Sequence, residues 1–265
     1  MPGPGAAPGR HRDGPGSLKR LAVPSPAAAQ LPLPLRLPRA AGFERFIADG
    51  NAEALAAART WSQDPVASTL YLHGGVGSGK THLLQAAAAE LAGSGRTVLY
   101  VPLDQAGLAP AMLEDLEQLD AVVIDALHAI AGRRDWEEAV FHLYNRLQAG
   151  GRRLLVAART PPADLRLSLA DLRSRLSAAP AYGLTPLDDN GRARLLRDGA
   201  EQRGLRLGEP VIGYVLSRCP RDPGWLLDFL DRLDRATLAE QRAPTVRFVA
   251  GLLDTPESVP VDPPA

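Results

Sequence analysis

The stretch Gly74-Gly75-Val76-Gly77-Ser78-Gly79-Lys80-Thr81 decides the fold of this 265-residue chain. It matches the phosphate-loop pattern G-x-x-x-x-G-K-[ST] in full, and it lies between a strand-like apolar run, 69–73, and a helical run, 81–91. Glycines let successive backbone N–H groups turn toward phosphate oxygens, and the following helix adds the positive end of its dipole. The stretch therefore predicts a nucleotide-binding α/β domain. The alternative is a glycine-rich turn that holds no ligand.

The residue types of this loop indicate what each contributes. Lys80 is a compact, flexible charge that can reach the β- and γ-phosphates. Thr81 offers a hydroxyl to Mg²⁺. For His82 the alternative is packing within the first helical turn. We expect nucleotide contacts from Gly74, Gly75, Val76, Gly77, Ser78, Gly79, Lys80, Thr81 and His82.

A second metal contact is expected at Asp125, which ends the apolar run 121–125. Its carboxylate would reach Mg²⁺ through water; the alternative is a carboxylate that caps the next turn. Hydrolytic ATPases of this class commonly place a second acid directly afterwards, but here Ala126 follows. The sequence therefore favours bound ATP or ADP over self-catalysed hydrolysis, and it leaves open whether the chain is itself an enzyme.

Strand and helix patterns alternate through the first part of the chain. We expect strands at 69–73, 97–101, 121–125, 153–157 and 181–184, and helices within 43–59, at 81–91, at 109–118 and from the cap Asp135 to 148. After Pro186 only helices are expected, at 188–203, 210–217, 224–241 and 245–253. Strands separated by helices indicate a parallel sheet flanked by helices, followed by a small C-terminal helical domain.

Composition separates a tail from a folded body. Residues 1–42 hold nine prolines and six glycines, and their six basic residues outnumber a single acid, whereas the whole chain has a formal charge of zero. We expect disordered tails at 1–42 and 254–265, an α/β nucleotide-binding domain at 43–186 and a helical lid domain at 187–253. Cys219 is the single cysteine, which excludes a disulfide framework. Without a long apolar run or a signal-peptide pattern, a cytoplasmic protein that does not enter membranes is expected.

Beyond these patterns, 71–84 resembles the corresponding stretch of the DnaA-type AAA+ initiators. Residues 43–46, followed by Gly50 and Asn51, resemble the short N-terminal motif of that clade, whose backbone cradles the adenine. The resemblance narrows to the Hda family of DnaA-homologous regulatory inactivators at 100–104, 130–132, 141–146, 159–162, 171–176 and 233–236. It covers the chain from about Gln30 to Leu253.

This resemblance implies a negative regulator of DNA replication initiation. Such a protein is a nucleotide-bound AAA+ adaptor that stimulates hydrolysis of the ATP held by DnaA. Arg175 matches the family's arginine finger, the catalytic group that would act in trans. The alternative is a solvated arginine on a helix face, and Arg173 is a second candidate. Self-association is left open.

The resemblance also implies a second partner, the DNA polymerase III sliding clamp. Gln30-Leu31-Pro32-Leu33-Pro34-Leu35 resembles the family's clamp-binding peptide, with contacts expected from Gln30, Leu31, Leu33 and Leu35. Composition alone would favour a linker without a partner. Because the chain ends soon after the lid, without the helix-turn-helix domain of DnaA, we expect contact with DNA only through the clamp.

Two positions depart from the family pattern. Arg159 stands where the family has an aspartate after the fourth strand, and Arg221 is the base nearest to the expected lid arginine. Together with Ala126 they favour a stably held nucleotide. The main alternative is an autonomous AAA+ ATPase such as a helicase loader. A small-molecule kinase would need a substrate-binding insertion, and the sequence shows none.

Overall fold

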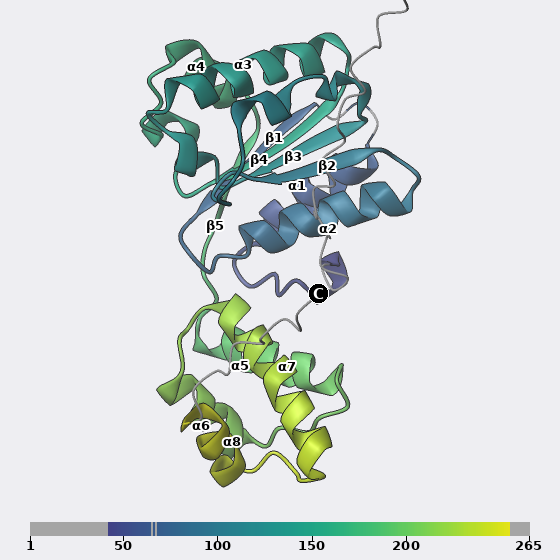
Figure 1. The fold of residues 1–265 in the computed structure, drawn as a ribbon. Coiled ribbons are helices and arrows are strands. Elements are labelled where there is room, and N and C mark those ends of the chain that lie inside the picture. Colours follow the sequence, from purple (N-terminus) through teal and green to yellow (C-terminus); the bar gives the residue numbers. More distant parts are fainter. Residues whose placement is uncertain (1–41, 65, 67, 255–265) are drawn as a thin grey trace, which may run out of the picture. The chain divides into compact units, whose positions relative to one another are not determined.

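The strands form one parallel sheet in the order β2-β3-β4-β1-β5 (Figure 1). The structure is a computed structural model that describes residues 42–64, 66 and 68–254. Its strands are β1 (Thr69–Gly74), β2 (Val98–Pro102), β3 (Ala121–Asp125), β4 (Arg153–Ala158) and β5 (Ala181–Leu184). The prediction of a parallel α/β sheet with a helical lid is confirmed.

Helices cover both faces of the sheet, which explains why its central strands are mainly apolar. The helices are α1 (Ala52–Gln63) and α2 (Lys80–Gly93) on one face, and α3 (Arg134–Ala149) and α4 (Ala170–Ser177) on the other (Figure 1). Alternate residues of one strand enter different cores: Val122 and Ile124 of β3 pack with the residues of α3, whereas Val123 packs with those of α2. This period of two is the pleat of a doubly covered strand.

The C-terminal part is helical and has a core of its own. It contains α5 (Asp189–Glu201), α6 (Glu209–Arg218), α7 (Pro223–Glu240) and α8 (Val246–Asp254). Leu196, Ile212 and Phe229 are buried in this core. Two aspartates cap helices as sequence rules suggest, since Asp188 accepts from the N–H of Gly191 and Asp222 from that of Trp225.

Two helix predictions were wrong. Instead of a helix at 109–118 there are two 3₁₀ turns, Pro110–Leu113 and Leu116–Gln118, because Asp115 between them has a φ of 56°. Asp135 does not cap α3: the cap is Arg133, and Asp135 lies in the first turn, where its charge complements the helix dipole. Helix α4 was not predicted as an element, since Leu172 and Leu176 are its only buried residues. Further 3₁₀ turns are Phe43–Arg45, Leu127–Ile130 and Pro162–Asp164.

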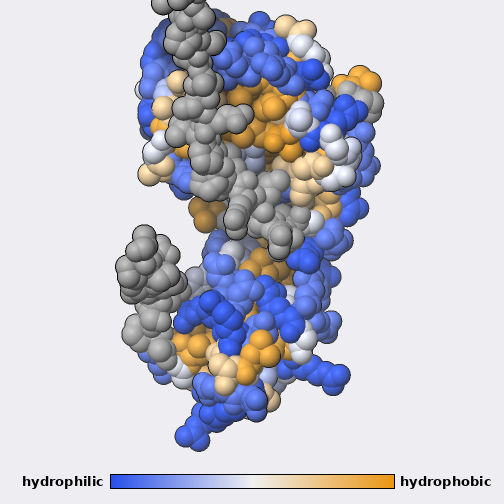
Figure 2. All heavy atoms as spheres, turned by 45° about the vertical axis from the view of Figure 1, so that its right-hand side comes forward, coloured by the Kyte–Doolittle hydropathy of each residue, from blue (hydrophilic) through white to orange (hydrophobic). Residues whose placement is uncertain are grey.

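The clamp-binding peptide 30–35 and nearly all of the expected tails lie outside the described residues. The exceptions are Gly42 and Asp254, and Asp254 is the last residue of α8 rather than part of a tail. Within the described part no helix is both long and apolar enough to cross a membrane. The visible surface is mainly hydrophilic, with apolar side chains gathered in separate areas (Figure 2). The most exposed large apolar side chains of the described residues are Val66, Val76 and Leu238.

One buried carboxylate joins the two helices on the α3 face. Glu137 is fully buried on α3, and it accepts hydrogen bonds from the backbone N–H groups of Gly132 (2.7 Å), Ser168 (3.1 Å) and Leu169 (2.7 Å). Ser168 and Leu169 immediately precede α4. Glu137 therefore satisfies the donors at the start of α4 and fixes that helix against α3.

Replacing this carboxylate should destabilise the fold. In Glu137→Gln the amide group can accept fewer hydrogen bonds and sets an N–H donor against a backbone donor, so we expect a loss of about 1–3 kcal/mol in the free energy of unfolding. The neighbouring Glu138→Gln is the matched control, because that side chain is 46% exposed and pairs only with Arg134; its cost should be about 0.5 kcal/mol or less. Urea denaturation measures both. Equal stabilities of the two variants would contradict the assigned role of Glu137.

Candidate functional site

The phosphate loop connects β1 to α2 at the carboxyl edge of the sheet, and its shape depends on glycine. Gly77 and Gly79 have φ values of 72° and 91°, a region that other residues rarely adopt. Gly79 is also crowded, since a Cβ there would lie 2.6 Å from Cε2 of Phe46. The segment before α1 thus packs directly on the loop, and only glycine fits at the contact.

Lys80 lies folded onto the loop that it follows. Its ammonium group donates to the carbonyl oxygens of Gly74 (2.8 Å) and Gly75 (2.7 Å) and to Oγ of Ser78 (3.2 Å). Partial burial lowers the pKa of Lys80, the charge of Asp125 raises it, and that of Arg159 lowers it further. Because these hydrogen-bond partners are neutral, the positive charge of the ammonium group can still attract an anion. The loop therefore suits a phosphate group.

The two predicted metal contacts lie side by side. Thr81 donates from Oγ1 to Oδ2 of Asp125 (2.7 Å), although the two residues are 44 positions apart. The buried carboxylate also accepts from the hydroxyl of Tyr100 (2.8 Å) and from the N–H of Ala126 (2.7 Å). Among the described residues there is no cluster of three or more His, Cys, Asp or Glu that could hold a metal. The pair therefore suits Mg²⁺ that keeps waters and phosphate oxygens as its other ligands.

Tyr100 was not predicted as part of this site. Burial, and then the neighbouring charge of Asp125, raise the pKa of Tyr100, so the hydroxyl stays protonated and donates to the carboxylate. Its position on β2, paired to β3, brings it there. A tyrosine in an apolar strand gives no signal of its own in the sequence, because packing accounts for it equally well.

His82 faces the segment that precedes α1. Its Nε2 lies 3.0 Å from the carbonyl oxygen of Gly42, and its ring centroid lies 5.8 Å from that of Phe46. A carbonyl oxygen only accepts, so Nε2 carries the proton. Nucleotide contact by His82 stays a prediction. In the structure the side chain fixes the segment whose counterpart cradles the adenine in the family that the chain resembles.

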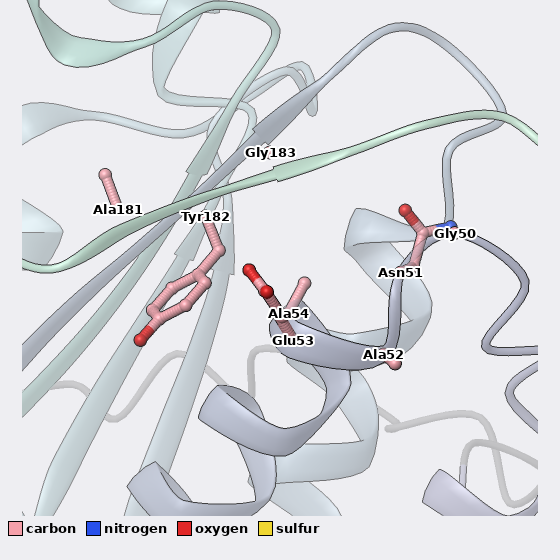
Figure 3. A pocket seen from close by; sticks show the side chains of 8 residues that line it. All are labelled: Gly50, Asn51, Ala52, Glu53, Ala54, Ala181, Tyr182 and Gly183. Carbon is pink, nitrogen blue, oxygen red and sulfur yellow. The ribbon is translucent and has the colours of Figure 1, made fainter.

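A hollow of about 470 Å³ lies beside the same segment, between the start of α1 and β5 (Figure 3). Its lining includes Glu53 and Tyr182, whose side chains project toward the same space. Asn51, which also lines the hollow, donates to the carbonyl of Thr185 (2.9 Å) and accepts from its N–H (2.8 Å). This buried amide joins the start of α1 to the chain that leaves β5.

Arg175 lies on the outer side of α4. Leu172 and Leu176 anchor that helix in the core, and the arginine between them is exposed. Its guanidinium carbon lies 6.0 Å from the ring centroid of Tyr144 on α3, a cation–π distance. Arg173 is exposed on the same helix. The predicted finger is therefore an outward-facing cation braced by an aromatic ring.

The two departures from the family pattern are placed differently. Arg159 follows β4 at the carboxyl edge, near enough to Lys80 for its charge to lower the pKa of the lysine. Arg221 pairs with Asp189 of α5 (3.6 Å), a contact within the lid. Arg159 thus lies with the loop, Thr81 and Asp125 at one edge of the sheet.

Two protein-family models match this chain. The bacterial DnaA ATPase domain matches residues 37–183, and the Hda lid domain matches residues 189–253. The chain belongs to the Hda family of DnaA-homologous regulatory inactivators. The family assignment confirms the predicted resemblance and gives the chain a DnaA-related regulatory role.

Solved structures support the fold alone, since their sequences are distant. Domain III of the replication initiation protein DnaA from Thermotoga maritima is 22% identical with a TM-score of 0.70, over 82% of this chain and 96% of that one. AMPPCP-bound DnaA from Aquifex aeolicus is 23% identical with a TM-score of 0.64, over 77% and 68%. The RuvB Holliday junction branch migration motor of Thermotoga maritima is 18% identical with a TM-score of 0.62, over 82% and 72%.

The partly buried histidines near the loop should make stability depend on pH. Burial lowers the pKa of His73, His82 and His128 below the ordinary 6.5. As the pH falls through 6.5 the unfolded chain takes up protons that the folded chain does not. The free energy of unfolding should therefore decrease, by at most about 1.4 kcal/mol per pH unit for each histidine, until the lowered pKa is reached.

Denaturant unfolding between pH 7.5 and 5.5 measures this slope. His82→Gln keeps a donor for the Gly42 carbonyl but cannot titrate, so its slope should be smaller than that of the parent. His142→Gln is the control, because His142 is exposed on α3. An unchanged slope in His82→Gln would show that His82 does not contribute.

Proposed function

We propose that the chain is a nucleotide-bound negative regulator of replication initiation, which binds the DNA-loaded sliding clamp and stimulates hydrolysis of the ATP held by DnaA. The observation that carries this proposal is Arg175, an exposed arginine on α4 whose guanidinium carbon lies 6.0 Å from the ring centroid of Tyr144. In a member of the Hda family the partner of that cation would be the nucleotide of a neighbouring DnaA.

The chain's own nucleotide would be held by the loop from Gly74 to Thr81. A distant relative, DnaA from Aquifex aeolicus, is described as bound to AMPPCP. In this chain Lys80 would exchange its carbonyl partners for phosphate oxygens, and Thr81 and Asp125 would hold Mg²⁺. When bound, the metal would neutralise phosphate charge. The resident nucleotide would be ATP or ADP.

The finger would act on a nucleotide outside the chain. A planar guanidinium suits bidentate contact with phosphate oxygens, and it remains charged at any physiological pH. Placed against the terminal phosphate of ATP on DnaA, Arg175 would stabilise the charge that develops during transfer to water. Arginine fingers of GTPases raise the rate by about 10³–10⁵. By contrast, Ala126 leaves the chain without the second acid that would polarise water at its own site.

The tether to the clamp would be Gln30, Leu31, Leu33 and Leu35. The alternating prolines favour an extended peptide, which loses less entropy on docking than a flexible one. Leucines would fill an apolar pocket, and the glutamine amide would anchor one end. DNA would then be reached through the clamp, which agrees with a formal charge of zero for the chain.

Arg175→Ala should abolish stimulation of DnaA. The assay mixes the full chain with clamp, DNA and DnaA preloaded with labelled ATP, and it follows the conversion to ADP. We expect the variant to fall about 10³-fold, to the rate of DnaA without this protein. Arg175→Lys keeps the charge but loses the fork, so it should restore only part of the rate.

Arg173→Ala is the matched control, because it removes an exposed arginine from the same helix. It should stimulate hydrolysis like the parent. If Arg175→Ala stimulated hydrolysis fully, or if only Arg173→Ala lost the stimulation, Arg175 would not be the arginine finger. Brisk ATP turnover by the chain alone, lost in Lys80→Ala, would instead support the alternative of an autonomous AAA+ ATPase such as a helicase loader.

Removing residues 30–35 should abolish the clamp-dependent activities and leave nucleotide binding intact. Without the peptide we expect loss of clamp binding and of clamp-dependent stimulation, while nucleotide binding stays unchanged. Surface-immobilised clamp measures the first effect directly. Leu33→Ala with Leu35→Ala should reproduce the deletion, whereas exchanging Arg36 for Ala should not. Clamp binding that survives the deletion would eliminate this tether.

A further inference from the structure

We infer that Tyr144 is a positioning residue for the arginine finger, and that its ring holds the guanidinium of Arg175 in place without occupying an N–H donor. The inference rests on the function proposed above, and it adds to the finger a residue from another helix. Tyr144 belongs to α3, whereas Arg175 belongs to α4.

The ring of Tyr144 is a support that the core keeps in place. Tyr144 is only 8% exposed, and it lies in the same core as Leu172 and Leu176 of α4. Helices α3 and α4 are in contact (Figure 1), and the buried carboxylate of Glu137 fixes the start of α4. Interiors packed in this way leave a ring little room to move. A group that rests on the ring is therefore held at a defined place.

The guanidinium of Arg175 lies over this ring at the surface. Its carbon Cζ is 6.0 Å from the ring centroid, and the residue is exposed. The negative face of an aromatic ring attracts a cation at this distance. A free arginine side chain samples many rotamers, and ordering it on a partner costs conformational entropy. By restricting the side chain beforehand, the ring lowers the part of this cost that falls on the encounter with DnaA.

The ring holds Arg175 without the use of its hydrogen-bond donors. Among the residues that the structure describes, no hydrogen bond or ion pair involves its guanidinium. Arg146 of α3 is held differently, since it donates to Glu117 (3.1 Å) and to the carbonyl of Leu113 (2.7 Å). An arginine held in that way would have to give up its partners before it could bind a phosphate. Arg175 keeps its five N–H donors for phosphate oxygens.

The one acid of α4 does not hold the arginine. Asp171 lies one turn before Arg175, at a spacing where an acid and a base on a helix can pair, and both residues are exposed. Between these two described residues there is no ion pair, and the guanidinium lies over Tyr144 instead. Without the ring, pairing with Asp171 would be open to the arginine. That pair would occupy the donors that a phosphate needs.

The test is the DnaA assay with the concentration of the full chain varied. It measures the maximal rate of ATP hydrolysis separately from the concentration that gives half of this rate. Tyr144→Leu should lower the maximal rate about 3- to 30-fold, because the finger loses its support. The half-maximal concentration should change by less than about twofold, because the ring does not bind DnaA itself. Tyr144→Phe keeps the face of the ring and should keep nearly the parent rate.

Tyr214→Leu is the matched control. It removes the same kind of ring from beneath an arginine of the lid, since Cζ of Arg218 lies 5.9 Å from the ring centroid of Tyr214 on α6. This variant should stimulate hydrolysis like the parent. Urea denaturation shows whether each variant is folded. If Tyr144→Leu does not fold, Tyr144→Met takes its place, because methionine also lacks a ring and adapts to irregular core space.

Three results would overturn the inference alone. They are a parent-like maximal rate in Tyr144→Leu, an equal loss in Tyr144→Phe, and a loss that appears only in the half-maximal concentration. The proposed function fails separately: it fails if the parent does not stimulate DnaA, or if Arg175→Ala stimulates as the parent does.

Discussion

The insertion of β1 between β4 and β5 is the constraint on which the site depends. Neither neighbour is adjacent to β1 in sequence, so each pairing joins distant parts of the chain. Once it forms, the loop after β1 meets the ends of β3 and β4 at one edge. Thr81 and Asp125 come within 2.7 Å through this topology, with no local signal between them. Every residue of the candidate nucleotide site is placed by that order of strands.

The same topology explains why the site is rigid where it must hold phosphate. Phe46 presses on Gly79 from the segment before α1, and His82 holds that segment through the carbonyl of Gly42. Tyr100 completes the contacts of Asp125 from the far side. These contacts fix the loop and the carboxylate before any ligand arrives, so little ordering entropy opposes binding. Lys80 donates only to neutral oxygens of the loop, and phosphate oxygens could replace these. Its ammonium group is therefore the part of the site expected to move.

Much of this was predictable from sequence, because short motifs record local requirements. The loop needs glycine at fixed spacing, and an apolar strand that ends in Asp125 needs burial on both faces; both patterns are visible in the chain. What sequence could not give was long-range placement. Tyr100 resembles any core aromatic until β2 is paired with β3, and Glu137 resembles an exposed helix acid until the start of α4 is laid against it. The helix predicted at 109–118 failed because the conformation of one residue, Asp115, interrupts it.

Two arginines sixteen positions apart lie in different surroundings. Arg159 leaves β4 toward the loop, and Arg175 projects outward from the helix that follows. The segment between them is held at both ends, since the hydroxyl of Tyr71 donates to the carbonyl of Thr160 (3.0 Å) and Glu137 accepts from the N–H groups of Ser168 and Leu169. A segment fixed in this way cannot bring one guanidinium to the place of the other. The two guanidinium groups therefore occupy separate places, one after β4 at the carboxyl edge of the sheet and the other on the exposed side of α4.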